Sequence, residues 1–142
     1  MKVIDASQML LGRFATRAAK MALLGEEVII VNCEKAYVSG NKVGVKDHYK
    51  QRQDRGVPLK GPYITRSPDR LVRRTVRGML PHRQEKGRQA YERVMTYLGV
   101  PEQFKNEQKI TFEDCHVSKL PHLKYVSLQD IAKHIGSSHL GE

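Results

Sequence analysis

The sequence predicts an α/β fold in a single domain, and three observations lead to this prediction. A short β-branched segment, an amphipathic segment and a continuous apolar run follow one another within the first 33 residues. This is the order of a βαβ unit, in which a crossover joins two parallel strands. Helical and extended patterns then continue without an internal repeat. A chain of 142 residues is also long enough to bury most of its apolar surface in one core.

The first 33 residues supply the βαβ unit. Residues 2–6 are short and partly β-branched, which predicts a strand. Residues 26–33 contain the apolar run VIIV, which is typical of a strand buried on both faces. Between them, residues 10–25 predict a helix that ends near Gly25. The apolar face of this helix consists of Leu11, Phe14, Ala15, Ala18, Met21, Ala22 and Leu24.

The next three segments are predicted as a turn, a helix and a loop. Residues 34–42 contain the end of a strand and a turn, because Gly40 and Asn41 suit positive φ. Residues 42–53 predict a basic helix interrupted by one glycine. Residues 54–66 contain two Gly and two Pro, which favours an extended loop.

A capped helix follows the loop. Ser67 suits the N-cap, Pro68 the first helical position and Asp69 the first turn. One side of the helix carries four arginines at i, i+3, i+4 and i+7, here termed the arginine stripe: Arg70, Arg73, Arg74 and Arg77. The opposite side carries Leu71, Val72, Thr75, Val76 and Met79. No acidic residue follows Asp69 until Glu85, so the stripe lacks the partners of an ordinary solvated face.

Three further elements complete the predicted order. A third helix over about residues 86–98 is expected to turn Ala90, Val94 and Leu98 inward and Arg88 and Arg93 outward. Residues 109–117 predict a strand with imperfect alternation. Residues 127–136 predict a terminal helix with a capping box of Ser127 and Asp130.

The charge of the chain is concentrated in one segment. The net charge is +10, and residues 42–93 hold 15 Lys and Arg against 5 Asp and Glu, while the rest of the chain is balanced. Uniform basicity would mean only a high isoelectric point, whereas concentrated basicity indicates a surface for a polyanion. Nucleic acid is the interpretation we favour. A generic solvated surface, an anionic membrane and an acidic protein remain alternatives.

The known nucleotide-binding motifs do not match this sequence. The turn between the first strand and the first helix offers only Gly12, where a dinucleotide site needs three glycines. Gly56 and Gly61 have the spacing of a P-loop, but Pro62 and Tyr63 occupy the positions of its Lys and its Ser or Thr. We therefore expect no nucleotide cofactor.

Metal and catalytic sites are not expected either. Cys33 and Cys115 are far apart and have no close histidine set, which favours two reduced core thiols in a cytosolic protein. Asp114, Cys115 and His116 are consecutive, but neighbours in a strand point to opposite faces, which works against their forming a relay. No secretory signal and no apolar run of the roughly 18 residues of a membrane span is visible. We expect no catalytic residue, no metal, no cofactor and no membrane.

Arginine forks match phosphate oxygens and can also stack on bases, so the basic segment suits RNA. The candidate RNA-binding residues are Lys42, Lys46, Lys50, Arg52, Arg66, Arg70, Arg73, Arg74, Arg77, His82, Arg83, Lys86 and Arg88. Tyr49 and Tyr63 are candidates for stacking on an unpaired base, with packing against the protein itself as the competing interpretation.

Two long strings resemble one protein family. VIDASQMLLGRFATRAAKMALLGEEVIIVNCEKAYVSGNK and RTVRGMLPHRQEKGRQAYERVMTYLGVP are similar to the universal ribosomal large-subunit protein thirteen family, across about residues 3–101. The lead-in RSPDRLVRRTVRGMLPH and the absence of Trp resemble its archaeal and eukaryotic branch. Two departures are Cys33, where the family usually has Ala, and the string TYLGVP.

The resemblance implies a fold and a function. The fold is a three-layer α/β/α sandwich on a mostly parallel four-stranded sheet, here with a basic helical and loop extension. The function is that of a non-enzymatic constituent of the large ribosomal subunit, which binds large-subunit ribosomal RNA. It would lie as a monomer beside neighbouring ribosomal proteins in the cytoplasm. The RNA-facing region corresponds to residues 40–46 and 73–83. An RNA-processing enzyme with a basic groove and a DNA-binding protein are the alternatives.

Overall fold

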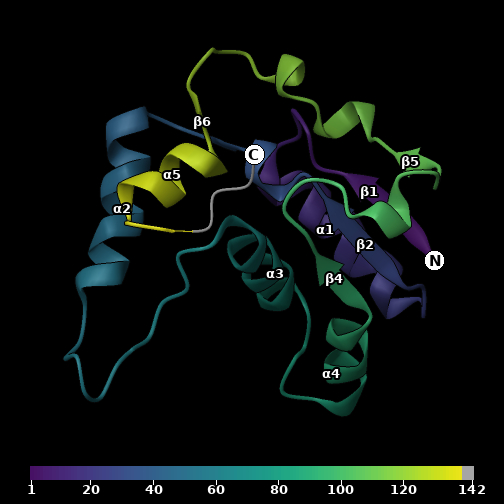
Figure 1. The fold of residues 1–142 in the computed structure, drawn as a ribbon, viewed down its shortest axis with the longest axis horizontal. Helices are drawn as coiled ribbons and strands as arrows, with labels where there is room; N and C mark the ends of the chain where they lie inside the picture. Colours follow the sequence, from purple (N-terminus) through teal and green to yellow (C-terminus); the bar gives the residue numbers. More distant parts are fainter. Residues whose placement is uncertain (139–142) are drawn as a thin grey trace.

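Four parallel strands form the central sheet of this computed structural model, which describes residues 1–138 (Figure 1). The strand order is β4–β2–β1–β5, with β1 (Lys2–Asp5), β2 (Val28–Val31), β4 (Val94–Thr96) and β5 (Lys109–Ile110). This sheet confirms the predicted α/β fold. Residues 139–142, which the predicted domain includes, lie outside the described residues.

The predicted βαβ unit is confirmed as β1, α1 (Leu11–Leu23) and β2. Ile4 lies opposite Ile30 in the parallel register, and both are fully buried. The helix ends at Leu23, and Gly25 two residues later has a φ of +96°, the left-handed conformation that glycine adopts without strain. One expectation was wrong. Leu24 is 74% exposed because it lies beyond the last turn, and Ala19 packs into the core instead.

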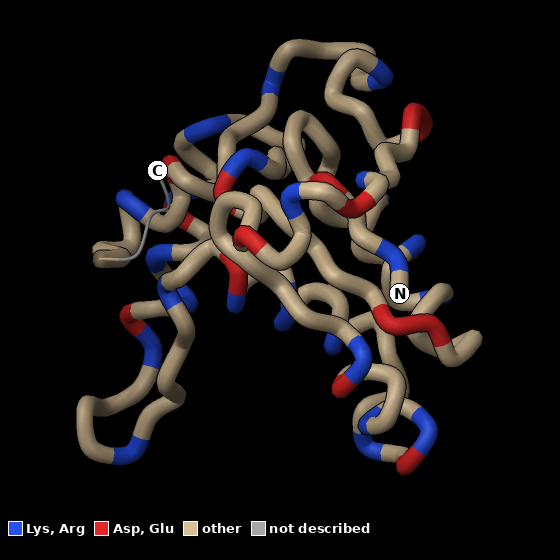
Figure 2. Tube along the Cα trace, turned by 45° about the vertical axis from the view of Figure 1, so that its right-hand side comes forward, with Lys and Arg blue, Asp and Glu red and all other residues tan. Residues whose placement is uncertain are grey.

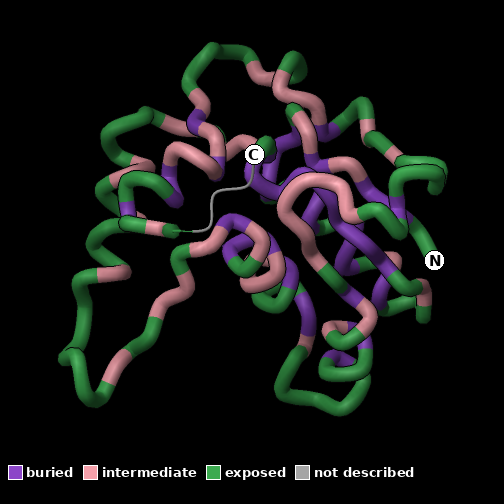
Figure 3. The backbone as a smooth tube through the Cα atoms, viewed as in Figure 1, coloured by how far each residue is buried: buried purple, intermediate pink, exposed green. Residues whose placement is uncertain are grey.

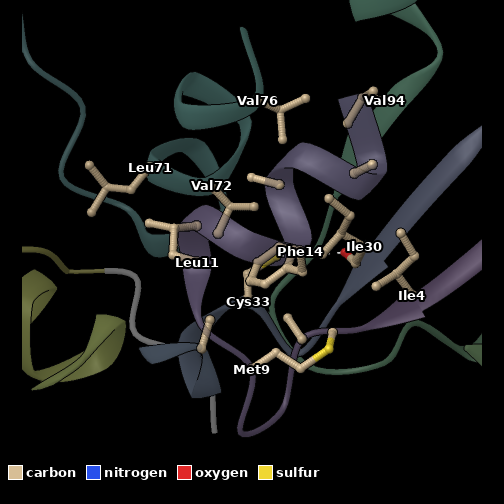
Figure 4. Close-up of a cluster of buried hydrophobic side chains, with 14 of the residues drawn as sticks. Ile4, Met9, Leu11, Phe14, Ile30, Cys33, Leu71, Val72, Val76 and Val94 are labelled. Carbon is tan, nitrogen blue, oxygen red and sulfur yellow. Dashed lines mark hydrogen bonds between the residues drawn. The ribbon is translucent and has the colours of Figure 1, made fainter. Parts of the chain in front are cut away.

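One face of the sheet is covered by three helices: α1, α3 (Pro68–Met79) and α4 (Glu85–Glu92). Figure 4 shows Phe14 of α1 at the centre of this core, with Val72 and Val76 of α3 directed toward α1 and Ile30 beside Phe14. In Figure 3 the buried residues follow the sheet and its covering helices, while the loops are exposed. This packing fixes α3 on the protein and leaves its other side free.

The opposite face of the sheet has a smaller core. Val3, Ile29 and Val31 point to this side and pack with Phe104. Phe104 belongs to the 3₁₀ helix η2 (Glu102–Phe104), and its ring lies 5.7 Å from that of Tyr97. Residues around η2 therefore form the layer on this face, which explains why every residue of the VIIV run is buried.

A second, two-stranded sheet lies beside the first. Its elements are the antiparallel strands β3 (Tyr37–Ser39) and β6 (Tyr125–Ser127), which follow η1 (Cys33–Lys35) and precede α5 (Leu128–His134) respectively. The predicted terminal helix is confirmed, because the Ser127 hydroxyl accepts the Asp130 N–H at 3.1 Å. The helix α2 (Lys42–Asp54) packs against α5 and β6 (Figure 1).

The predicted third helix was too long. It ends at Glu92, and β4 begins at Val94. Val94 pairs with Val28, and the Tyr97 N–H donates to the Ile30 carbonyl at 2.8 Å. The helical spacing of residues 90, 94 and 98 was misleading because pairing with β2, which is distant in sequence, determines the conformation after residue 93.

The strand predicted over residues 109–117 was also too long. Only Lys109 and Ile110 pair with β1. The chain then forms two 3₁₀ helices, η3 (Glu113–Cys115) and η4 (Val117–Lys119). The Leu10 N–H donates to the Cys115 carbonyl at 2.8 Å, so contacts with residues 8–10 satisfy this backbone instead of a longer strand.

Candidate nucleic-acid interface

The basic segment occupies a single connection of the fold. Residues 42–93 lie between β2 and β4, which are adjacent parallel strands, and include α2, the loop of residues 55–67, α3 and α4. Figure 1 shows the loop and α4 extending in the same direction on either side of α3. Figure 2 shows Lys and Arg on these elements and between them. The crossover thus collects the excess charge on one side of the sheet.

The start of α3 follows the prediction with one difference. Ser67 has the extended conformation of an N-cap, and its carbonyl accepts the Leu71 N–H at 3.0 Å. Its hydroxyl donates to the Asp69 carboxylate instead of accepting a backbone N–H. The carboxylate still lies in the first turn, where it interacts favourably with the helix dipole.

The two faces of α3 are separated as predicted, apart from Met79. Leu71, Val72 and Val76 are buried. Met79 is 40% exposed, and its sulfur accepts a hydrogen bond from the Thr16 hydroxyl, so it lies at the margin of the core because the helix ends there. The arginine stripe is therefore held on a helix whose other face is anchored.

The arginine stripe has no acidic partner within the described residues. None of its four members forms an ion pair with a carboxylate of residues 1–138. The Arg73 guanidinium lies over the ring of Tyr91, 4.7 Å from the centroid, and its Nε is buried without a hydrogen-bond partner among these residues. Partial burial, with Arg52 and Arg77 nearby, lowers the pKa of Arg74. Such a cluster attracts anions.

Two hollows border the arginine stripe. The first, of about 340 Å³, lies between α2 and α3 and is lined by Tyr49, Arg52, Ile64, Leu71, Arg74, Thr75, Arg77, Gly78 and His82. The second, of about 390 Å³, lies between the loop, α3 and α4 and is lined by Pro62, Tyr63, Ile64, Thr65, Tyr91 and the four arginines. Arg74 and Arg77 line both hollows, so a ligand in either would meet the stripe.

The predicted residues of α2 divide into two faces. Lys42, Lys46 and Lys50 recur every fourth residue, and Arg52 projects from another side of the helix. Arg52 lines the first hollow with Arg74. Lys50 forms an ion pair with Asp54 at 2.8 Å. The structure thus brings Arg52 to the stripe and gives Lys50 an intrahelical partner.

The remaining predicted residues have different surroundings. Arg66 donates to the Gly136 carbonyl at 3.4 Å, which joins the loop to the region after α5. His82 lines the first hollow. Arg83 and Lys86 are exposed in the turn after α3 and at the start of α4. Arg88 forms an ion pair with Glu85, one turn away on the same helix.

Sequence reasoning missed two cations and misplaced a third. Arg55 and Lys60 are exposed on the loop of residues 55–67, and the net charge of the segment was the signal that could have included them. Arg93, expected on the outer face of a helix, is half-buried and donates to the Ala22 carbonyl at 3.3 Å because β4 begins beside it. Its role is to tie α4 to the end of α1.

The two candidate tyrosines differ. Tyr49 packs against the main core, and burial raises its pKa although Arg52 opposes this change. Tyr63 is 76% exposed, and its hydroxyl donates to the Leu59 carbonyl at 2.9 Å. The packing interpretation therefore describes Tyr49, and only Tyr63 presents a free ring.

Residues 114–116 do not form a catalytic relay. They lie in and after η3 and not in a strand, so the argument from strand alternation was wrong. The Asp114 carboxylate pairs with Arg17 at 3.2 Å, and the His116 Nε2 lies 3.0 Å from the Gln8 side-chain oxygen. Burial raises the pKa of the Cys115 thiol. Each side chain is thus engaged elsewhere or protonated.

Residues 1–138 contain no group of three or more His, Cys, Asp or Glu that could hold a metal ion. No helix in this part of the chain is long and apolar enough to cross a membrane.

Comparisons with known proteins match this chain to a ribosomal protein family. The family model described as "Ribosomal protein L13" matches residues 1–103. The chain is 43% identical to the large ribosomal subunit protein uL13 of Archaeoglobus fulgidus over 135 residues, which cover 94% of this chain and 86% of that protein. It is 41% identical to uL13 of Methanococcoides burtonii over 137 residues, covering 96% and 99% respectively. For uL13 of Methanocaldococcus jannaschii the identity is 40%, with 96% and 98% covered.

Proposed function

Because the chain belongs to the ribosomal protein L13 family, we propose that it is a structural constituent of the large ribosomal subunit that binds ribosomal RNA. Membership in a ribosomal protein family supports a non-catalytic role in translation. As a ribosomal protein, the chain is located in the cytoplasmic ribosome. In this proposal it acts as a monomer, folds as one domain, contacts neighbouring large-subunit proteins and supports assembly and stability of the subunit.

The arginine stripe is the observation that supports RNA binding most strongly. Four arginines on one anchored helix have no acidic partner among the described residues, and Arg52 adds a fifth cation from α2. Guanidinium forks bind phosphate oxygens in pairs, and such contacts determine position and affinity without reading sequence. We propose that the stripe, Arg52 and the exposed cations of the loop and α4 contact RNA phosphates.

The other predicted residues remain part of the proposed RNA-binding surface, but we expect them to contribute unequally to RNA binding. His82, Arg83 and Lys86 continue it past α3, and Lys42 and Lys46 extend it along α2. Lys50 and Arg88 would first have to leave their intrahelical carboxylates, which costs little for exposed pairs. Arg66 contributes chiefly by holding the loop.

The direct test is a sucrose gradient of cell lysate, blotted for this chain before and after a high-salt wash of the ribosomal fraction. We expect stoichiometric recovery in the large-subunit peak and retention through the wash, because many phosphate contacts would have to break together. Release at the first modest salt step, or absence from the peak, would contradict the proposal.

A charge reversal tests the surface itself. The variant Arg73→Glu/Arg74→Glu/Arg77→Glu is expected to bind large-subunit ribosomal RNA at least a hundredfold more weakly and to fail to assemble, because it loses three phosphate contacts. Each lost contact should also lower the slope of log affinity against log salt by roughly 0.7 to 0.9 units. The matched control reverses three exposed lysines outside the basic segment, Lys20, Lys119 and Lys133, and changes the net charge equally. Equal loss of binding in both variants would mean that total charge, not this surface, binds RNA. Added duplex DNA should compete poorly with the RNA for the unmodified chain.

A further inference from the structure

The second hollow contains features that general attraction to phosphate does not explain. It is lined by two tyrosines, Tyr63 from the loop and Tyr91 from α4, together with the arginine stripe. Tyr91 is already covered by the guanidinium of Arg73. Tyr63 is 76% exposed and has no ring partner among the described residues. The hollow therefore combines a free aromatic face with several cations.

The loop holds the Tyr63 ring in place. The Val57 N–H donates to the Gly61 carbonyl at 3.1 Å, and the Gly61 N–H donates to the Val57 carbonyl at 2.9 Å, which closes residues 57–61 into a tight turn. The Tyr63 hydroxyl donates to the Leu59 carbonyl within this turn. A side chain at Gly61 would lie 3.3 Å from the edge of the Tyr63 ring, so glycine leaves room for it. The ring is thus positioned before any ligand binds.

We propose that this hollow binds one unpaired nucleotide of RNA, with its base stacked on Tyr63 and its phosphate on the arginine stripe. The inference rests on the proposed RNA-binding function and adds a specific site to it. Base stacking on an aromatic ring requires a base that has left its helix, because the faces of paired bases are covered by their neighbours. The site therefore selects a bulge, a loop or a strand end of the RNA.

The size and charge of the hollow favour this ligand over an acidic peptide. A volume of about 390 Å³ lies at the low end of pockets for small ligands, which span ~300–1,000 Å³. A carboxylate side chain would satisfy the arginines but leave the Tyr63 ring exposed. Arg73 also lines the hollow, so its guanidinium adds donors for a phosphate or base oxygen.

The chain has no Trp, so a single introduced indole reports on this site. The variant Tyr63→Trp, titrated with in vitro transcribed large-subunit ribosomal RNA, is expected to lose most of its indole fluorescence, because a stacked base quenches it. The control Leu123→Trp places the indole at a residue that is 91% exposed and outside the basic segment, and its fluorescence should change little. The variant Tyr63→Leu should bind the same RNA roughly tenfold more weakly, as expected for one lost stacking contact.

The outcomes separate this inference from the proposed function. Quenching in Tyr63→Trp but not in Leu123→Trp, with weaker binding by Tyr63→Leu, supports the nucleotide site. Full affinity and no quenching at position 63, while charge reversal of the stripe still abolishes binding, would overturn the site and leave the proposed function intact. If reversal of the stripe also leaves binding unchanged, the proposed function fails. Circular dichroism of Tyr63→Leu should match that of the unmodified chain, because the ring is exposed.

Discussion

Asp5 connects the end of β1 to the start of the segment after β2. Its Oδ1 accepts the Ser7 N–H and the Asn32 side-chain amide, both at 3.0 Å. Asn32 has a φ of +55°, a conformation that asparagine tolerates better than most residues, and its amide stabilises this turn. Burial raises the pKa of the Asp5 carboxyl, but the hydrogen bonds from Asn32 and Ser7 and the charge of Lys109 outweigh it, so the net pKa is lowered.

This lowered pKa predicts a pH dependence of stability. The contribution of Asp5 is fully present above its ordinary pKa and is lost as the pH falls through the lower folded value. The variant Asp5→Asn is expected to reduce the free energy of unfolding at pH 7 by about 1–3 kcal/mol, because it weakens two hydrogen bonds. Urea unfolding at several pH values should show that the difference from the unmodified chain narrows below pH 4. A constant difference down to pH 2 would contradict this assignment.

At the scale of elements, α4 packs directly on the turn that follows α3. A Cβ at Gly87 would lie 2.1 Å from the Pro81 carbonyl oxygen, so only glycine permits this contact. The variant Gly87→Ala must push α4 away from the turn and is expected to lower the free energy of unfolding by roughly 1–3 kcal/mol. Thermal or urea unfolding measures the change.

A second glycine provides the control for this prediction. Gly12 lies in the first turn of α1, and a Cβ there would meet no atom within 4 Å. The variant Gly12→Ala should leave stability unchanged or raise it by up to about 1 kcal/mol, because alanine has the higher helix propensity. If Gly87→Ala were as stable as Gly12→Ala, the close packing of α4 on the turn would be wrong.

The elements also show what sequence patterns can predict. The caps of α3 and α5 and the apolar face of α1 are local features, and these three helices were predicted close to their observed positions. The boundary between α4 and β4 is not local, since the Val28 N–H donates to the Arg93 carbonyl from a strand more than sixty positions earlier. The apolar spacing of residues 90, 94 and 98 fits a continuous helix as well as it fits the observed helix followed by a strand. Only the pairing with β2 decides between these two conformations.

At the scale of the whole molecule, the sequence predicts the charge of the candidate nucleic-acid interface more completely than the packing of its residues. The spacing of the arginine stripe was sufficient to place it on one face. That Arg52 joins the stripe and that Tyr91 lies beneath Arg73 depend on how three elements pack, which no single segment encodes. The pairing of Lys50 and Arg88 could have been foreseen, because Asp54 and Glu85 lie at i+4 and i−3.

The concentration of charge should make the free protein less stable than its core permits. Arg52, Arg74 and Arg77 repel one another, as the lowered pKa of Arg74 reflects after partial burial. The variant Arg74→Met keeps the aliphatic stem and removes one charge, so we expect it to raise the free energy of unfolding by roughly 0.5–1 kcal/mol at low salt. Raising the salt to about 0.5 M should stabilise the unmodified chain more than the variant, since screening relieves the same repulsion.

The same variant should bind ribosomal RNA more weakly, with a salt slope smaller by about one unit, because one phosphate contact is lost. Lys20→Met is the control: it removes one exposed charge from α1, outside the basic segment. Urea unfolding of both variants at two salt concentrations measures the change in stability, and RNA titrations of both variants measure the change in affinity. Equal stabilisation by Lys20→Met would assign the effect to total charge. If Arg74→Met were more stable and bound RNA with undiminished affinity, the repulsion among these arginines would be supported, but the proposed phosphate contact of Arg74 would be wrong. We expect stability and RNA affinity to change in opposite directions, because the charges that repel in the free protein are those that RNA phosphates would neutralise in the proposed complex.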